Sequence, residues 1–288
     1  ITKDGSISLS SQFYNESFHS HFGALSEAQS KFINPSSINR FKGKDVKVLD
    51  ICFGLGYNSA LLFKEISQQS SSLNWYGLEI DKRPLKFAMD NELFRALWDQ
   101  KVLKILSSLL KNDSYKDELH KCKLIWGDAR TRISEIPKDL NFDLIFLDGF
   151  SPQRCPEIWT VEFLSKVTKK LTPEGRLITY SSAAAIRKTL IDLNFKILNI
   201  KPNEDTINKW SNGTLAITKQ NKIEIQDNLH IEKLSIMQKE HLWTKSAVPY
   251  RDPNGNNTSE EILKRRKEEQ LISHLNESNL WRKKWILS

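Results

Sequence analysis

Three acidic side chains in this chain each follow a short apolar segment, and a glycine-containing turn follows another such segment. The acids are Glu79, Asp128 and Asp148. The turn covers residues 53–58. Short apolar segments bounded by turn residues predict buried strands, and open α/β sheets bind ligands at the carboxyl ends of their strands. The pattern therefore predicts a small-molecule site built from one turn and three carboxylates.

The turn belongs to the segment Val46–Asn58, whose sequence is VKVLDICFGLGYN. A strand, a glycine turn and the helical pattern of Ser59–Ile66 form the opening unit of a doubly wound α/β domain. Glycines let the backbone approach a ligand, and the start of a helix offers unpaired N–H groups. The expected cofactor contacts are Phe53, Gly54, Gly56 and Asn58. An ordinary tight turn without a ligand explains the two glycines equally well.

Glu79 lies roughly 20 residues beyond the glycines, where nucleotide-binding α/β folds place an acid on the ribose hydroxyls. Ser59 stands where the third glycine of a G-x-G-x-x-G motif would be, so no pyrophosphate need lie against this helix. An adenosine cofactor without phosphates fits better, and S-adenosylmethionine is the common one. The alternative for Glu79 is a solvated carboxylate at a strand end.

Asp128 and Ala129 follow the predicted strand Lys123–Trp126 and are the expected contacts to the adenine. A carboxylate in this place can accept a hydrogen bond from an adenine amino group. Aspartate is equally suited to cap the helix that begins at Thr131. The two roles are compatible only if they use different carboxylate oxygens.

The order of the elements predicts the fold. Phe142–Phe150, FDLIFLDGF, is the clearest buried strand, because a continuous apolar run is typical of a central parallel strand. The last two strands, Phe195–Ile200 and Thr214–Thr218, are expected to pair antiparallel around the loop 201–213. We therefore predict an α/β fold of the class I S-adenosylmethionine-dependent methyltransferases. Its Rossmann-like, mostly parallel sheet would have seven strands, with an N-terminal arm and a C-terminal extension.

Three parts of the chain are expected. Residues 1–45 would form an N-terminal arm, and the mixture of aromatic and polar residues in Phe13–Ala28 favours a lid over the cofactor rather than a plain cap on the sheet. Residues 46–219 would form the methyltransferase domain. Residues 220–288 would be a charged extension packed on or beside the core, since Tyr250 between apolar and proline residues is unlike a free linker.

Composition narrows the partners and the compartment. The 288 residues carry a net charge of +8, which favours a polyanionic partner. The three cysteines show neither metal-ligand spacing nor an even disulfide set, and His19 and His21 have no third ligand nearby. No apolar run is long enough to cross a membrane, and no signal peptide is found. We expect a cytoplasmic protein that binds no metal and no membrane.

FLDGFSP, residues 146–152, is followed by PEIW, residues 156–159. This combination specifically resembles the MnmC-like tRNA methyltransferase family, which makes 5-methylaminomethyl-2-thiouridine at the wobble position of certain tRNAs. The other similar segments are DGSISLSS, HSHFGALSEA, FGLGYN, WGDAR, TYSSAAAIRK and VPYRDP. Bifunctional members carry a flavin oxidase domain. Nothing after Thr218 has the length or the glycine motif for it, so a stand-alone methyltransferase is expected.

The resemblance implies methyl transfer from S-adenosylmethionine to the aminomethyl group at C5 of the wobble uridine or 2-thiouridine of tRNA. An oxidase or other tRNA-modifying enzymes would supply that aminomethyl group. An amine of pKa about 10.4 is neutral in only about 1 in 10³ molecules at pH 7, and Asp148 is the candidate that orients it and accepts its proton. A carboxylate also stabilises the ammonium form, whereas desolvation and the sulfonium oppose it, so the net sign stays open.

The substrate side is expected from two aromatic residues and the loops around them. Phe150 or Trp159 would stack on the extruded uracil, although packing under the loop is the favoured explanation for Trp159. Pro152, Ser181 and Ser182 would line the substrate pocket, and the two serines can instead cap their helix.

The basic clusters Lys264–Lys267 and Arg282–Lys284 indicate either a solvated helix face or contacts to tRNA phosphates. Two rival functions remain at this point. One is a methyltransferase acting on another RNA, a protein or a small-molecule amine, since fold does not determine function. The other is a non-catalytic RNA-binding protein on the same fold.

Overall fold

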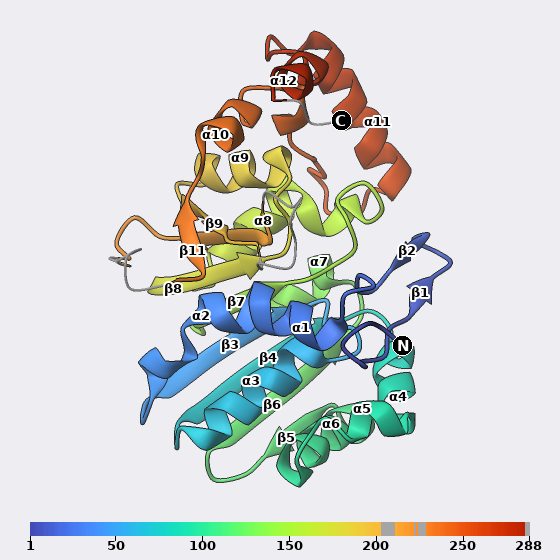
Figure 1. The fold of residues 1–288 in the computed structure, drawn as a ribbon, viewed down its shortest axis with the longest axis vertical. Helices are drawn as coiled ribbons and strands as arrows, with labels where there is room; N and C mark the ends of the chain where they lie inside the picture. Colours follow the sequence, from blue (N-terminus) through green and yellow to red (C-terminus); the bar gives the residue numbers. More distant parts are fainter. Residues whose placement is uncertain (203–210, 222, 224–228, 286–288) are drawn as a thin grey trace.

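A sheet that has nine strands among the described residues organises the protein, and its five central strands run parallel. The structure is a computed structural model that describes residues 1–202, 211–221, 223 and 229–285. The order across the sheet is β11-β9-β10-β8-β7-β3-β4-β6-β5 (Figure 1). The strands are β3 (Asp45–Ile51), β4 (Ser72–Glu79), β5 (Ser114–Lys116), β6 (His120–Trp126), β7 (Phe142–Leu147), β8 (Leu171–Thr179), β9 (Lys196–Ile200), β10 (Gly213–Ile217) and β11 (Ile231–Lys233).

The pairing confirms the predicted class I methyltransferase fold. Strands β6, β4, β3, β7 and β8 pair in parallel, and the predicted terminal pair, β9 and β10, is antiparallel. The prediction of seven strands is wrong, because β5 and β11 extend the sheet at its two edges. Each is a three-residue strand without a readable apolar alternation, and only its pairing with a longer neighbour makes it a strand. Most of the predicted loop 201–213 lies outside the described residues.

Helices cover both faces of the sheet and continue beyond it. They are α1 (Ala24–Ala28), a π-helical turn (Gln29–Ile33), α2 (Asn34–Ser36), α3 (Tyr57–Gln68), α4 (Lys82–Asp90), α5 (Glu92–Arg95), α6 (Gln100–Asn112), α7 (Ala129–Arg132), α8 (Val161–Thr168), α9 (Ala184–Asp192), α10 (Ile236–His241), α11 (Ser259–Ile272) and α12 (Ser278–Lys284). Short 3₁₀ turns are formed by Ile38–Phe41, Ile133–Glu135, Pro156–Trp159 and Lys245–Ala247. In the described part of the chain, no helix is long and apolar enough to cross a membrane.

Two hydrophobic cores lie on opposite faces of the sheet, and the apolar run of β7 contributes to both. Leu144 and Phe146 belong to the core that also contains α3 and α6. Ile145 and Leu147 belong to the core that contains α8 and α9, and so does Phe142, which precedes a register shift between Phe142 and Leu144. Successive side chains of a strand point to opposite faces, so a strand covered on both sides must be apolar throughout.

Ser59, at the position of the missing third glycine, has a structural role beneath the turn. Its hydroxyl donates to the fully buried Asp50 at 2.6 Å and accepts the indole N–H of Trp75 at 2.8 Å. Burial raises the pKa of Asp50 to about 7. The hydroxyl thus satisfies buried polar groups at the end of β3, which a glycine would leave without a partner.

The N-terminal arm and the C-terminal extension both contact the sheet. The arm begins with the hairpin β1 (Ser10–Ser11) and β2 (Glu16–Ser17), and its later turns pack on α3. The extension adds β11 to the sheet, beyond the expected boundary at residue 219. Tyr250 is buried, and its carbonyl accepts the N–H of Val161 at the start of α8. Figure 1 shows α10, α11 and α12 beyond α9, near the C-terminus.

Candidate cofactor and substrate site

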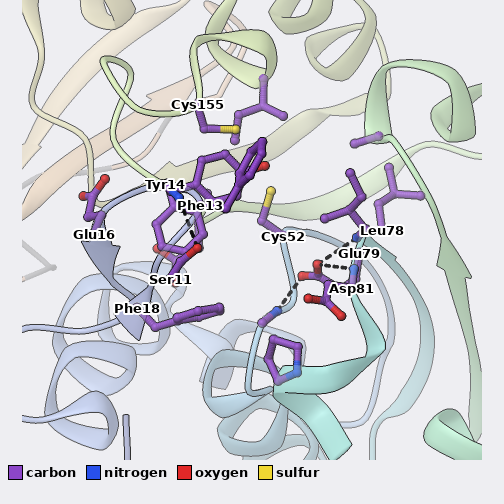
Figure 2. A pocket seen from close by; sticks show the side chains of 18 of the residues that line it. Ser11, Phe13, Tyr14, Glu16, Phe18, Cys52, Leu78, Glu79, Asp81 and Cys155 are labelled. Atoms are coloured by element: carbon purple, nitrogen blue, oxygen red, sulfur yellow. Dashed lines mark hydrogen bonds between the residues drawn. The ribbon is translucent and has the colours of Figure 1, made fainter. Parts of the chain in front are cut away.

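A cavity of about 740 Å³ lies between the carboxyl ends of the parallel strands and the N-terminal hairpin (Figure 2). Its volume is in the range of sites for one cofactor-sized ligand, about 300–1,000 Å³. Six residues expected from the sequence line it: Gly54, Glu79, Asp128, Ala129, Asp148 and Phe150. Seven carboxylates and three cationic side chains are among the residues that line it, so this cavity is acidic in a chain of net charge +8. Such a lining favours ligands that carry positive charge.

Glu79 ends β4 and is held by three backbone N–H groups. Its Oε2 accepts from Gly54 at 2.8 Å, and its Oε1 accepts from Ile80 at 2.7 Å and Asp81 at 2.9 Å (Figure 2). Burial raises the pKa of this carboxyl, while the three N–H groups oppose the shift. The glycine turn and the acid are therefore one rigid unit.

Only part of the turn reaches the cavity. The ring of Phe53 packs 5.5 Å from Trp75 in the core, so only the backbone of this residue is left for the predicted cofactor contact. Gly56 has a φ of 93° directly before α3, where a Cβ atom would come within 2.8 Å of that ring. Its glycine is thus required by the turn and by packing, and Gly54 forms the cavity wall.

Asp148 is the first residue after β7 and is half-buried. The side-chain amide of Asn58 donates to its Oδ2 at 2.7 Å, so Asn58 holds the acid and does not itself line the cavity. Burial raises the pKa of Asp148 to about 6, opposed by the Asn58 hydrogen bond and by the charge of Lys31. The site therefore contains an oriented carboxylate that is more basic than an ordinary one.

Asp128 caps α7, which confirms the helix-cap interpretation for one of its oxygens. Its Oδ1 accepts the backbone N–H of Arg130 at 2.9 Å, and its Oδ2 pairs with the Arg130 guanidinium at 2.7 Å. The same guanidinium donates to the buried Asp252 at 2.8 Å and to the carbonyl of Asn257 at 2.8 Å. The adenine contact of Asp128 stays a prediction. The C-terminal extension supports this wall of the cavity, a link of 122 residues that no local pattern showed.

Phe150 lines the cavity, whereas the proposal that Trp159 stacks on a base is wrong. Trp159 is fully buried, and its indole N–H donates to the Phe150 carbonyl at 2.8 Å. The packing alternative is correct for this residue, which supports the loop from below. The other expected substrate residues, Pro152, Ser181 and Ser182, lie off the cavity wall. Ser181 accepts the N–H of Ala183 in the turn before α9, and its side chain is buried.

The N-terminal arm supplies a wall that the sequence indicated only by its mixture of aromatic and polar residues. It contributes Tyr14, Glu16, Phe18, His19, Glu27 and Lys31. Glu27 and Lys31 form an ion pair of 2.9 Å one helical turn apart, and burial lowers the pKa of His19 to about 4. In the described part of the chain, no group of three or more His, Cys, Asp or Glu side chains is placed to hold a metal ion.

Comparison with known proteins adds to this geometry. Residues 91–209 match a family model described as S-adenosyl-L-methionine-dependent methyltransferase. An uncharacterized protein of Methanocaldococcus jannaschii is 31% identical over 281 residues, covering 93% of this chain and 70% of that relative. The chain is also similar to the crystal structure of MNMC2 from Aquifex aeolicus, with a TM-score of 0.78, 28% identity, and coverage of 94% of this chain and 83% of that one.

This chain belongs to the MnmC-like family of S-adenosyl-L-methionine-dependent methyltransferases. It is 28% identical over 203 residues to the tRNA 5-methylaminomethyl-2-thiouridine biosynthesis bifunctional protein MnmC of Paraburkholderia phytofirmans. That match covers 65% of this chain and 30% of the relative, so the chain spans less than a third of the bifunctional protein.

The cofactor of this methyltransferase is S-adenosyl-L-methionine, which supplies a methyl group on a cationic sulfonium. The acidic cavity suits that charge. Glu79, fixed at the end of β4, lines the cavity together with Gly54, and its contact with the ribose hydroxyls stays a prediction. Asp128 and Ala129 are placed on the wall expected for the adenine.

Glu79→Gln is expected to weaken S-adenosyl-L-methionine binding by about tenfold or more, because a hydrogen bond to a charged group contributes about 1.5–3 kcal/mol. The amide keeps one acceptor oxygen and turns a donor toward the N–H of Gly54. Titration calorimetry measures the affinity. Glu118→Gln, an exposed change away from the cavity, is the matched control. Unchanged affinity with native melting would contradict the ribose assignment.

Several residues of the basic clusters Lys264–Lys267 and Arg282–Lys284 form hydrogen bonds or ion pairs within the protein. Arg265 donates to the Arg251 carbonyl at 2.7 Å, and Arg266 donates to the Val248 carbonyl at 2.8 Å and lies over the Tyr250 ring. Lys284 pairs with Glu240 at 2.6 Å. Arg265 and Arg266 are thus already engaged within the protein, and phosphate contacts by these clusters stay a prediction. The exposed residues of the clusters are Lys264, Lys267, Arg282, Lys283 and Lys284.

Proposed function

We propose that this methyltransferase acts on the aminomethyl group at C5 of the wobble uridine or 2-thiouridine of tRNA, forming 5-methylaminomethyl-(2-thio)uridine. The observation that carries the proposal is Asp148, a half-buried carboxylate that Asn58 orients at the cavity beside Phe150. The MnmC relatives are named for the biosynthesis of this nucleoside. Because the aminomethyl group must already exist, enzymes that build it on uridine act before this protein.

The residues contribute proximity, desolvation and a proton acceptor. Asp148 accepts a hydrogen bond from the amine and orients its lone pair toward the cofactor side of the cavity. As the new N–C bond forms and the sulfur–methyl bond breaks, the nitrogen loses a proton, and the Asp148 carboxylate takes it. Its pKa of about 6 makes it a stronger base than an ordinary aspartate, yet it is largely ionised at pH 7.

Methyl transfer into tRNA tests this proposal. Bulk tRNA from cells lacking the activity is incubated with the protein and radiolabelled S-adenosyl-L-methionine, and nucleosides from the tRNA are identified by mass. We expect label in 5-methylaminomethyl-(2-thio)uridine. Matched tRNA without the aminomethyl group should remain unlabelled. Label in another nucleoside, or transfer only to proteins or small amines, would contradict the proposal.

The rate should depend on pH through two groups, Asp148 and the amine. Methyl transfer needs Asp148 ionised and the amine neutral, so log kcat/KM should rise with a slope of about two below pH 6 and about one above it. The sign follows from a raised carboxyl pKa: the acceptor is lost as pH falls through about 6. Steady-state kinetics from pH 5 to 9 measure the slopes. A single slope throughout would remove Asp148 as the titrating group.

A further inference from the structure

Tyr14 occupies the space against Phe150 that a stacked base needs. Their ring centroids are 4.5 Å apart with 28° between the ring planes, so no second planar ring fits between them. Phe18 meets Phe150 edge-on at 5.0 Å. All three rings line the cavity, and Figure 2 shows two of them, Tyr14 and Phe18. A pyrimidine can therefore stack on Phe150 in this way only after Tyr14 has left it.

The side chain of Tyr14 lies in the cavity rather than on the outer surface of the protein. The Tyr14 ring is half-buried and packs against the core that includes Cys155 and Trp159, while the adjacent Phe13 is 87% exposed. Burial and the neighbouring Cys155 raise the pKa of the Tyr14 hydroxyl. The hairpin that carries both also contacts the loop after β7, because Glu16 Oε2 accepts the N–H of Ser151 at 3.0 Å and its hydroxyl at 2.8 Å. Asn15, between Tyr14 and Glu16, has a φ of 48°, a left-handed conformation that asparagine tolerates.

We propose that the face of Phe150 covered by Tyr14 is the subsite for the pyrimidine ring of the substrate, and that the hairpin of residues 10–17 must withdraw Tyr14 before the base binds. The ligand class is an unpaired RNA base, which aromatic side chains bind by stacking. The Glu16–Ser151 contact is the latch of the covered state. This inference rests on the proposed function, because it takes the methylated base to be a uridine.

The covered state lowers the apparent affinity for RNA, since only the fraction of molecules with Tyr14 withdrawn can bind the base. Removing the ring or the latch should therefore tighten binding, whereas removing Phe150 should weaken it. If Tyr14 instead stacked on the second face of the bound base, with Phe150 on the first, removing its ring would weaken RNA binding. The direction of the change thus separates a cover from a stacking partner.

The test uses the full protein and an anticodon stem-loop RNA that carries 5-aminomethyluridine at the wobble position, compared with the same RNA lacking that base. Tyr14→Ala should lower KM for the RNA by roughly three- to tenfold with little change in S-adenosyl-L-methionine affinity. Glu16→Gln should change KM in the same direction, and Tyr14→Phe, which keeps the ring, should change it less than Tyr14→Ala. In a direct binding assay, Phe150→Ala should abolish the preference for the RNA that carries the base.

The control is Phe87→Ala, which removes a partly exposed aromatic ring from α4 outside the cavity wall. A higher KM for Tyr14→Ala would overturn the proposal and indicate that the base stacks between Tyr14 and Phe150. An unchanged KM would also overturn it and leave Tyr14 with only a packing role. In either case, methylation of the RNA by the wild-type protein would still support the proposed function. If the wild-type protein does not methylate aminomethyl-uridine in tRNA at all, both proposals fail.

Discussion

Asp148→Asn is expected to lower the methyl-transfer rate by about 10²- to 10⁴-fold, the usual contribution of a positioned general acid or base. The amide keeps nearly the same shape but has neither the charge nor the basicity to take a proton from the amine. Asn58 can still contact it through the side-chain oxygen, so the fold and the cavity should persist. Single-turnover transfer to aminomethyl-uridine tRNA measures the rate, and calorimetry measures cofactor affinity.

Asp139→Asn is the matched control for this change. Asp139 is an exposed aspartate shortly before β7, and Asp148 lies directly after that strand. The control should transfer methyl groups at the wild-type rate. Asp148 has no catalytic role if its variant also shows wild-type single turnovers, and a loss of cofactor affinity in step with the rate would make it a binding residue.

Asp252→Ala should cost about 3–5 kcal/mol of unfolding free energy, because it leaves a buried guanidinium without one of its partners. The Asp252 side chain is 1% exposed and that of Arg130 is 13% exposed. Asp252 also accepts two backbone N–H groups, from Asn256 at 3.2 Å and Asn257 at 3.1 Å. Because Arg130 also holds Asp128, cofactor affinity should fall as well. Urea unfolding and calorimetry measure the two effects.

Glu269→Gln provides the comparison, since it breaks the pair between Glu269 and Arg251, whose side chains are 30% and 44% exposed. Exposed ion pairs contribute only about 0–1 kcal/mol. Equal destabilisation by the two variants would show that burial does not govern the Arg130–Asp252 pair. Full stability of Asp252→Ala with weakened cofactor binding would assign Asp252 to the site alone.

Local patterns were sufficient for the elements that meet at the cavity. Residues 46–58 predicted β3, the turn and α3, because positive φ at Gly54 and Gly56 and a continuous apolar strand are properties of neighbouring residues. Acids directly after strands predicted that Glu79, Asp128 and Asp148 would share one edge, since the parallel strands that precede them must end together. These features depend on short-range sterics and on the period of a strand.

The other features of the site and of the sheet were decided by contacts between segments that lie far apart in the sequence. The sequence favoured packing for Trp159 but left a substrate contact open, and only the fold of the loop buried it beneath Phe150. Tyr14 covers Phe150 across 136 positions of the chain, and Asp252 holds Arg130 across 122. The two three-residue edge strands exist because longer neighbours pair with them. Sequence alone thus determined the fold class and the acids of the site, whereas tertiary packing decided which aromatic ring is accessible, because burial depends on contacts that no local period encodes.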